Sequence, residues 1–310
     1  MRLATRGSTL ALAQAKSVAA ELRARGAEVE IVPITTEGDR RFGARLADFG
    51  GKGLFVREIE EALLDGRVDI AVHSLKDLPA ELPDGLALVT YPEREAAHDV
   101  LVTRDGGTLE TLRRGAVVGT SSARRRALAL AARPDLVIEP IRGNVETRLR
   151  KLETAGLDAV ILAAAGLHRL GVIAPHAVAL DSDVFVPAVG QGILGVEARK
   201  DDHRTLAWLE PLDHAPTRAA ALAERAFLTR LGASCATPMA GHAVLLPAGG
   251  DGPVLSMSAV VLSEDGRRLL RAASTGAPER AEVLGHDLAE SLLAHGAASI
   301  TNLRPRGEVA

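Results

Sequence analysis

The chain has 310 residues, of which 47% are hydrophobic and 25% charged, and its net charge is −3 at pH 7. This length and composition predict two or three domains of an ordinary globular protein. The acidic balance and the 2% aromatic content disfavour nucleic-acid binding, which needs a basic surface or exposed stacking rings. The one cysteine, Cys235, excludes an internal disulfide and a thiolate metal cluster, and the histidines show no metal-ligand spacing.

No stretch of the sequence resembles a leader peptide or a membrane span. The segment Met1–Lys16 reads as a strand followed by a helix, and no run of about 18 apolar residues occurs. We therefore expect a cytoplasmic protein without a membrane partner, a nucleic-acid partner or a bound metal.

Strand and helix patterns alternate through the first 73 or so residues of the chain. A short strand at 3–5 precedes a helix that Ser8 can cap and Gly26 can end. The pattern then predicts a strand at 29–33, a Gly-rich stretch at 49–53, a helix at 54–64 and a buried strand at 69–73.

A second set of strands and helices begins near Asp99 and echoes the first. The pattern predicts strands at 100–103, 116–120, 136–139 and 158–163. It also predicts a helix that starts at Ser121 or Ser122 and stops before Pro134, and a helix at 144–155. The run Gly66-Arg-Val-Asp-Ile-Ala-Val returns as Gly156-Leu-Asp-Ala-Val-Ile-Leu. Two lobes of parallel βαβ units would enclose a cleft, with ligand-binding loops at the carboxyl ends of the strands.

The character of the sequence changes from about residue 215. An Ala-rich helix at 216–231 precedes the Cys235 loop, a hairpin follows at 254–262 and 267–273, and a last helix covers 278–295. This segment predicts a small α+β domain. A lone cysteine is most often a buried, inert side chain, so composition alone gives Cys235 no role.

Basic side chains gather at strand–helix junctions. In GTSSARRR, residues 119–126, Arg124 and Arg125 stand with Arg126 in the first helical turn, where cations oppose the helix dipole and so favour a bound anion. In IRGNVETRLRKL, residues 141–152, Arg142 lies in the loop and Arg148 on the helix. The alternative for both motifs is a solvated charge run.

Three further loops extend this pattern. Lys76 and Asp77 follow the buried strand in HSLKDLP, and Arg6 and Ser8 follow the first strand in ATRGS. Lysine binds anions as a point charge, whereas aspartate can hold a proton or stabilise a cation; the alternative is a surface turn. The segment GGKGLFVRE, residues 50–58, lacks the spacing of a phosphate loop and favours a hinge or lid. Five basic loops on an acidic chain indicate a polyanionic ligand.

Taken together and in order, these motifs resemble the porphobilinogen deaminase (hydroxymethylbilane synthase) family. The matches continue through ILAAAGLHRLG and PAVGQGILGVE to LGASCATPMAG and span nearly the whole chain. The resemblance implies an α/β fold with two periplasmic-binding-protein-like lobes, mostly parallel sheets and a small α+β third domain. The implied boundaries are 1–92 with 193–210 for lobe 1, 98–186 for lobe 2, and 215–310 for the third domain.

The resemblance also implies a transferase that joins four porphobilinogen molecules head to tail into hydroxymethylbilane with loss of ammonia. A dipyrromethane cofactor, bound to Cys235 through a thioether, would be the primer, and the enzyme would act as a monomer. Asp77 matches the catalytic aspartate, and Lys52 and Phe55 match a mobile lid. Matches to residues that bind cofactor and substrate are Arg6, Ser8, Lys76, Thr120, Ser122, Arg124, Arg125, Arg142 and Arg148.

Two alternatives and one departure accompany this resemblance. A non-catalytic two-lobe anion-binding protein would explain the basic cleft but not a third domain with a cysteine. A nucleic-acid-binding module would use the arginine run but is disfavoured by the net charge. Asp48 departs from the family pattern, because relatives often carry lysine there.

Overall fold

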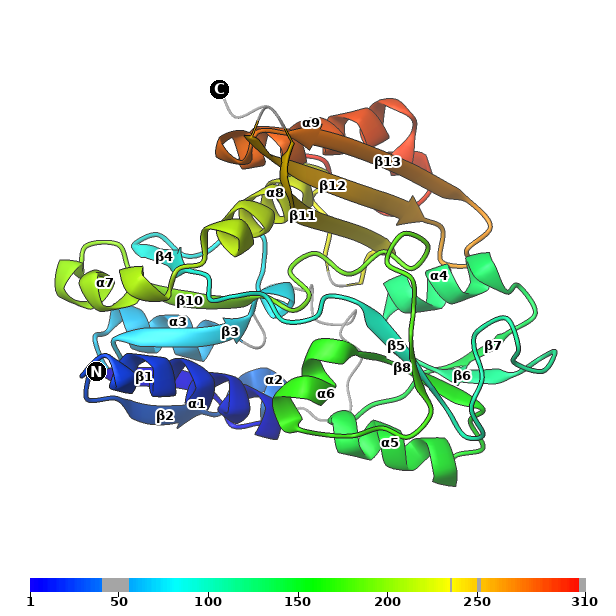
Figure 1. Cartoon of the computed structure of the whole chain (residues 1–310), viewed down its shortest axis with the longest axis horizontal. Coiled ribbons are helices and arrows are strands. Elements are labelled where there is room, and N and C mark those ends of the chain that lie inside the picture. The colour runs from blue at the N-terminus through cyan, green and yellow to red at the C-terminus, as the bar shows by residue number, and fades with distance from the viewer. Residues whose placement is uncertain (41–55, 235, 250–251, 307–310) are drawn as a thin grey trace.

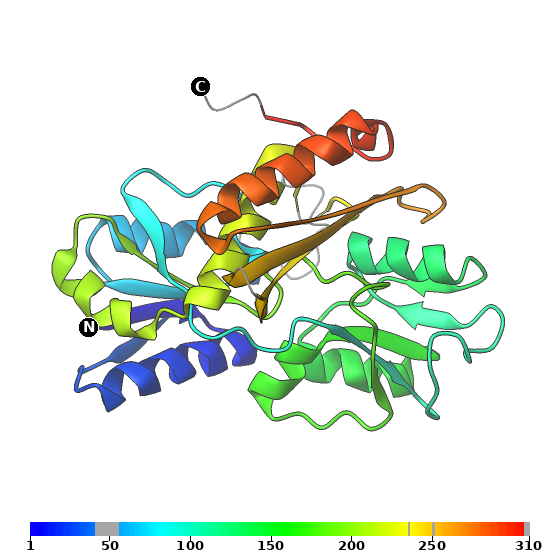
Figure 2. The same ribbon diagram turned by 45° about the horizontal axis from the view of Figure 1, so that its top comes forward.

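The computed structural model describes residues 1–40, 56–234, 236–249 and 252–306. Two lobes lie side by side, and a smaller domain lies across one end of both (Figures 1 and 2). The α/β architecture with a small third domain is the one that the sequence predicts.

Lobe 1 is built on a five-stranded mixed sheet in the order β2-β1-β3-β10-β4. The strands β2, β1 and β3 are parallel, whereas β10 runs antiparallel to both β3 and β4. The elements are β1 (Arg2–Arg6), α1 (Thr9–Ala24), β2 (Glu30–Ile34), α2 (Glu37–Arg40), α3 (Arg57–Leu64), β3 (Ile70–Ser74), β4 (Leu86–Thr90), β10 (Leu194–Arg199) and α7 (His203–Leu209).

Lobe 2 repeats this arrangement with the strand order β7-β6-β8-β5-β9. Here β7, β6 and β8 are parallel, and β5 runs antiparallel to both β8 and β9. The elements are β5 (Asp99–Thr103), β6 (Val117–Gly119), α4 (Ala123–Ala132), β7 (Val137–Glu139), α5 (Val145–Thr154), β8 (Ala159–Ala163), α6 (Ala164–Leu170) and β9 (Ala177–Ala179).

The two sheets are topological equivalents, which confirms the internal echo in the sequence. The repeated segments, which begin at Gly66 and Gly156 and each contain an Asp, lead into β3 and β8, the central strands of the two orders. In each sheet four strands share one direction, and the fifth, β10 or β5, opposes them. These opposing strands are the first that the chain forms after it crosses from one lobe to the other (Figure 1).

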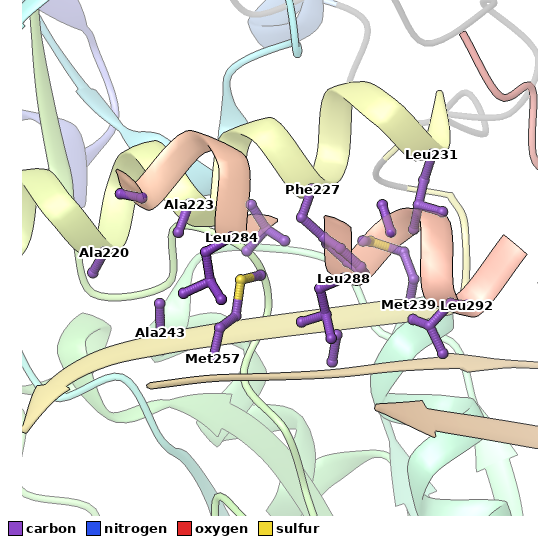
Figure 3. Packing of buried hydrophobic residues seen from close by; sticks show 14 of the residues in the cluster. Ala220, Ala223, Phe227, Leu231, Met239, Ala243, Met257, Leu284, Leu288 and Leu292 are labelled. Atoms are coloured by element: carbon purple, nitrogen blue, oxygen red, sulfur yellow. The ribbon is translucent and has the colours of Figure 1, made fainter. Parts of the chain in front are cut away.

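The third domain packs two helices on one face of an antiparallel sheet, β11-β12-β13. Its core gathers Phe227, Leu231, Met257 and Leu288, all at most 3% exposed, between the helices and the sheet (Figure 3). Burying side chains of this size contributes about 1.5–3 kcal/mol each. The elements are α8 (Ala215–Leu231), β11 (Met239–Gly249), β12 (Gly252–Leu262), β13 (Leu269–Gly276) and α9 (Ala281–Ala294).

Side-chain caps fix the helix starts that face the site. Ser8 Oγ accepts from the Ala11 N–H, Ser122 Oγ from the Arg125 N–H, and Asn144 Oδ1 from the Thr147 N–H. The predicted caps are confirmed, with Ser122 rather than Ser121 chosen for α4. In contrast, the sequence patterns did not predict β4, β9, β10, β11 or α6 as elements.

Candidate active site

The predicted site residues follow strands of both lobes at the carboxyl ends, as the cleft hypothesis expects. In lobe 1, Arg6 ends β1 and Ser8 caps α1. Both residues line a small pocket of about 70 Å³, and Asp77 and His73 line the same pocket. The structure therefore brings together two of the predicted loops, ATRGS and HSLKDLP, around one hollow.

Lys76 and Asp77 belong to a short 3-10 turn, Leu75–Asp77, directly after β3. Asp77 is exposed, whereas burial lowers the pKa of Lys76 to about 8. Arg125 lowers this pKa further, and the carboxylates of Asp77 and Asp99 oppose the shift. Lys76 of lobe 1 thus lies within electrostatic reach of the arginine-rich loop of lobe 2.

A carboxylate of the same lobe pairs with two arginines of that loop. Asp99 Oδ2 lies 2.7 Å from Arg124 Nη2, and Asp99 Oδ1 lies 2.7 Å from Arg125 Nη2. Asp99 is 0% exposed, and the two arginines are 4% and 6% exposed. Burial alone would raise the pKa of Asp99, but the guanidiniums lower it to about 2. The chain itself therefore supplies an anion to two of the three arginines, while Arg126 is exposed.

Thr120 and Ser122 hold the backbone of the same loop. The Thr120 hydroxyl is buried and accepts from the Ser122 N–H at 3.2 Å. Ser121 Oγ donates to Ile141 O at 2.6 Å, which ties this loop to the next basic loop. This hydrogen bond joins the two basic motifs of lobe 2.

Arg142 and Arg148 are placed differently from Arg124 and Arg125. Arg142 is exposed in the loop before α5, and Arg148 is half-buried, with Nε donating to Gly143 O at 2.9 Å. Burial and then Arg125 lower the pKa of Arg148, and Asp77 opposes this shift. Since Asp77 belongs to lobe 1, its carboxylate acts electrostatically on Arg148 of lobe 2.

The sequence motifs gave no role to two buried acids of lobe 1, Glu60 and Glu197. His73 Nε2 lies 3.0 Å from Glu197 Oε2, with both side chains almost fully buried. Burial, Glu197 and Glu61 raise the pKa of Glu60 to about 7, and Glu60 Oε1 has no hydrogen-bond partner within the described residues. Unlike Asp99, Glu60 has an acid rather than an arginine beside it.

Comparison with known proteins identifies the family to which this sequence belongs. The model described as "Porphobilinogen deaminase, dipyromethane cofactor binding domain" matches residues 1–207, and "Porphobilinogen deaminase, C-terminal domain" matches residues 219–294. Curated porphobilinogen deaminases from Syntrophotalea carbinolica and Trichlorobacter lovleyi are 49% and 48% identical over 302 residues, covering 97% of this chain and 94% and 95% of the relatives. The chain belongs to the porphobilinogen deaminase family.

The family membership agrees with the resemblance seen in the motifs and with the two-lobed α/β fold. Among solved structures, an ABC-transporter periplasmic substrate-binding protein from Coxiella burnetii has a TM-score of 0.41 at 16% identity, covering 68% of this chain and 91% of its own.

Several positions that the porphobilinogen deaminase resemblance singles out lie outside the described residues. These are Asp48, the lid positions Lys52 and Phe55, and the cofactor-attachment position Cys235. The elements that flank Cys235 are described: α8 ends at Leu231, and β11 begins at Met239.

Neither a metal site nor a membrane-spanning helix is found among the described residues of this chain. Within it, no three His, Cys, Asp or Glu side chains gather in a way that would hold a metal ion. None of its described helices is long and apolar enough to cross a bilayer.

Two residues that the motifs did not single out connect the site of this family member. Asp99 anchors both buried arginines, and Gln191 joins Asp99 to Lys76. Asp99 stands in the sequence as a lone acid at the start of the apolar strand Asp99–Thr103, and Gln191 lies in the PAVGQGILGVE motif, which gave it no role. No spacing rule connects Asp99 to arginines 25 and 26 positions later.

Proposed function

We propose that this chain condenses four porphobilinogen molecules head to tail into hydroxymethylbilane. In each step the C–N bond of the aminomethyl group breaks and ammonia leaves. A C–C bond then forms to the free α-carbon of the growing chain, which loses a proton. After four steps, water cleaves the C–C bond between the tetrapyrrole and the primer, adds its hydroxyl to the released product and returns a proton to the primer. Membership in the porphobilinogen deaminase family is the observation that carries this proposal.

The residues of the cleft fit a dipyrromethane cofactor, which carries several carboxylates. A buried carboxylate needs charge-assisted hydrogen bonds, each contributing about 1.5–3 kcal/mol, to offset its loss of hydration. The donor set for cofactor and substrate would be Arg6, Ser8, Lys76, Thr120, Ser122, Arg124, Arg125, Arg142 and Arg148. When bound, the cofactor supplies the nucleophilic pyrrole end that primes the chain.

Within this set the arginines would have two different roles. Arg124 and Arg125 already pair with Asp99, so we propose that they act mainly through loop position and field. Arg142 and Arg148 are more exposed and would contact carboxylates directly.

Asp77 is proposed as the catalytic group. Its carboxylate is exposed at the lobe 1 pocket and near Arg148. From there it would assist the departure of ammonia and stabilise the cationic pyrrole that forms on the substrate, an electrostatic role.

Further features of this chain are proposed from its membership in the porphobilinogen deaminase family. We propose a thioether between Cys235 and the cofactor, a lid that contains Lys52 and Phe55, and action as a cytoplasmic monomer. We also propose boundaries of 1–92 with 193–210, 98–186 and 215–310, which the membership of β10 in the lobe 1 sheet supports.

Turnover of porphobilinogen by the purified protein tests the proposed function. We expect ammonia and hydroxymethylbilane in a four-to-one ratio. A protein that binds porphobilinogen but releases no ammonia would instead be a non-catalytic anion-binding protein.

A further inference from the structure

Gln191 lies in the return crossing from lobe 2 to lobe 1 and is 1% exposed. Its neighbours, Gly190 and Gly192, have φ of +72° and +85°, a region that favours glycine. A Cβ at Gly190 would lie 2.9 Å from Lys76 N, and one at Gly192 would lie 2.2 Å from Glu95 O. Gly190 thus lets this crossing lie directly against the Lys76 turn, and Gly192 lets it lie against the segment at Glu95.

The side-chain amide of Gln191 binds both lobes at once. Its Nε2 donates to Asp99 Oδ1, at the start of lobe 2, at 2.9 Å and to Ala97 O, in the crossing just before it, at 2.6 Å. Its Oε1 accepts from Lys76 Nζ of lobe 1 at 3.3 Å. Only an amide presents donors and an acceptor on one neutral group at this length.

We propose that Gln191 is a positioning residue, which holds Lys76 in register with the Asp99–Arg124–Arg125 cluster so that both lobes present one basic surface to pyrrole carboxylates. This inference rests on the proposed function. The residue acts through Lys76, and no contact between Gln191 and substrate is needed.

The charged groups around Lys76 make its protonation a reporter of this contact. Asp77 and Asp99 favour the ammonium form, whereas burial, Arg125 and Arg124 disfavour it. Gln191 adds a neutral acceptor to the ammonium. Its removal should therefore make Lys76 lose its proton at lower pH.

The test compares Gln191→Met with Thr90→Val in the holoenzyme. Thr90 is 1% exposed and donates a buried hydrogen bond to Leu209 O within lobe 1, so it matches the loss of a buried polar contact. The pH dependence of Lys76 acylation, followed by peptide mass spectrometry, reports Lys76 directly. We expect its midpoint to fall by about one pH unit in Gln191→Met and to stay unchanged in Thr90→Val.

Activity gives the second readout. We expect kcat/KM for porphobilinogen to fall about tenfold or more in Gln191→Met and to change less than about twofold in Thr90→Val. Gln191→Asn guards against loss of folding, because it keeps an amide in the crossing but is too short to span both partners. A smaller fall in the same direction is expected there.

An unchanged Lys76 midpoint together with wild-type kcat/KM in a folded Gln191 variant would overturn the inference. Failure of the proposed function looks different, because the wild-type protein would then release no ammonia, while the acylation midpoint would still test the contact.

Discussion

The two lobes share one topology, but the pKa values of their buried acids shift in opposite directions. In lobe 2, Asp99 is surrounded by two guanidiniums, and its pKa falls to about 2. In lobe 1, Glu60 has Glu197 beside it and an unpartnered oxygen, and its pKa rises to about 7. Burial raises both values, so the sign of the neighbouring charge decides the outcome.

The acids of the candidate site also differ between the lobes, because Asp99 of lobe 2 is buried and paired, whereas Asp77 of lobe 1 is exposed. Asp99 offsets one of the two guanidinium charges and ties both arginines to the strand β5, so this cluster is a structural scaffold of lobe 2. The carboxylate of Asp77 in lobe 1 is exposed and available to a ligand. An arginine at a strand–helix junction therefore does not by itself indicate a ligand contact.

Loss of Asp99 should have the largest effect on stability. Asp99→Asn leaves Arg124 and Arg125 buried without their anion, which should cost about 3–5 kcal/mol in the free energy of unfolding. Urea unfolding measures this cost. Asp65→Asn removes only an exposed pair with Arg67 and should cost less than about 1 kcal/mol. Equal losses in the two variants would refute the scaffold role.

Loss of the Asp77 charge should affect turnover rather than stability. Asp77→Asn should lower kcat about 100-fold or more, because an electrostatic group at the reacting centre is lost. Steady-state release of ammonia measures this, with Asp84→Asn, an exposed acid nearby in the sequence, as the control. Near-normal turnover in Asp77→Asn would remove this residue from the mechanism.

Arg148 and Arg150 lie on the same helix and allow a matched comparison. Arg148→Ala should reduce kcat/KM about 10- to 100-fold through loss of charge-assisted hydrogen bonds to substrate carboxylates. Arg150→Ala removes an exposed cation and should change kcat/KM less than about twofold. The proposed contact fails if the two variants behave alike.

Glu60→Gln should give the smallest effect, one that depends on pH. The folded protein binds the Glu60 proton more tightly than the unfolded chain, whose pKa is near 4.5. The free energy of unfolding therefore falls as pH rises from about 4.5 to 7 and is level above. The variant should exceed wild type by about 1 kcal/mol at pH 8 and by little at pH 5, as urea unfolding at the two pH values would measure. A pH-independent difference would show that Glu60 ionises freely.

Local signals predicted much of the fold because they act over a few residues. The Ser8 and Asn144 caps and the buried strand at β3 follow from side-chain chemistry and hydropathy. In contrast, β10 contains Gly195 and the buried acid Glu197, so its pattern is not typical of a strand. Only in the folded chain does His73 partner Glu197, and a Cβ on Gly195 would come within 2.8 Å of Leu88.

The candidate site was predicted by its loops but not by its internal pairing. The motifs pointed to Arg124 and Arg125, yet their partner Asp99 comes from another strand. Gln191 is farther still, 115 positions from Lys76. Such contacts depend on how the chain crosses between the lobes, which no local pattern encodes.

The intact mass of the purified protein, beside that of Cys235→Ser, tests the account most directly. If the cleft holds a primer tethered by sulfur, the wild-type mass will exceed the 32.4 kDa of the sequence by one dipyrromethane, and the variant will lack this increment. An active wild-type protein with the bare sequence mass would contradict the account.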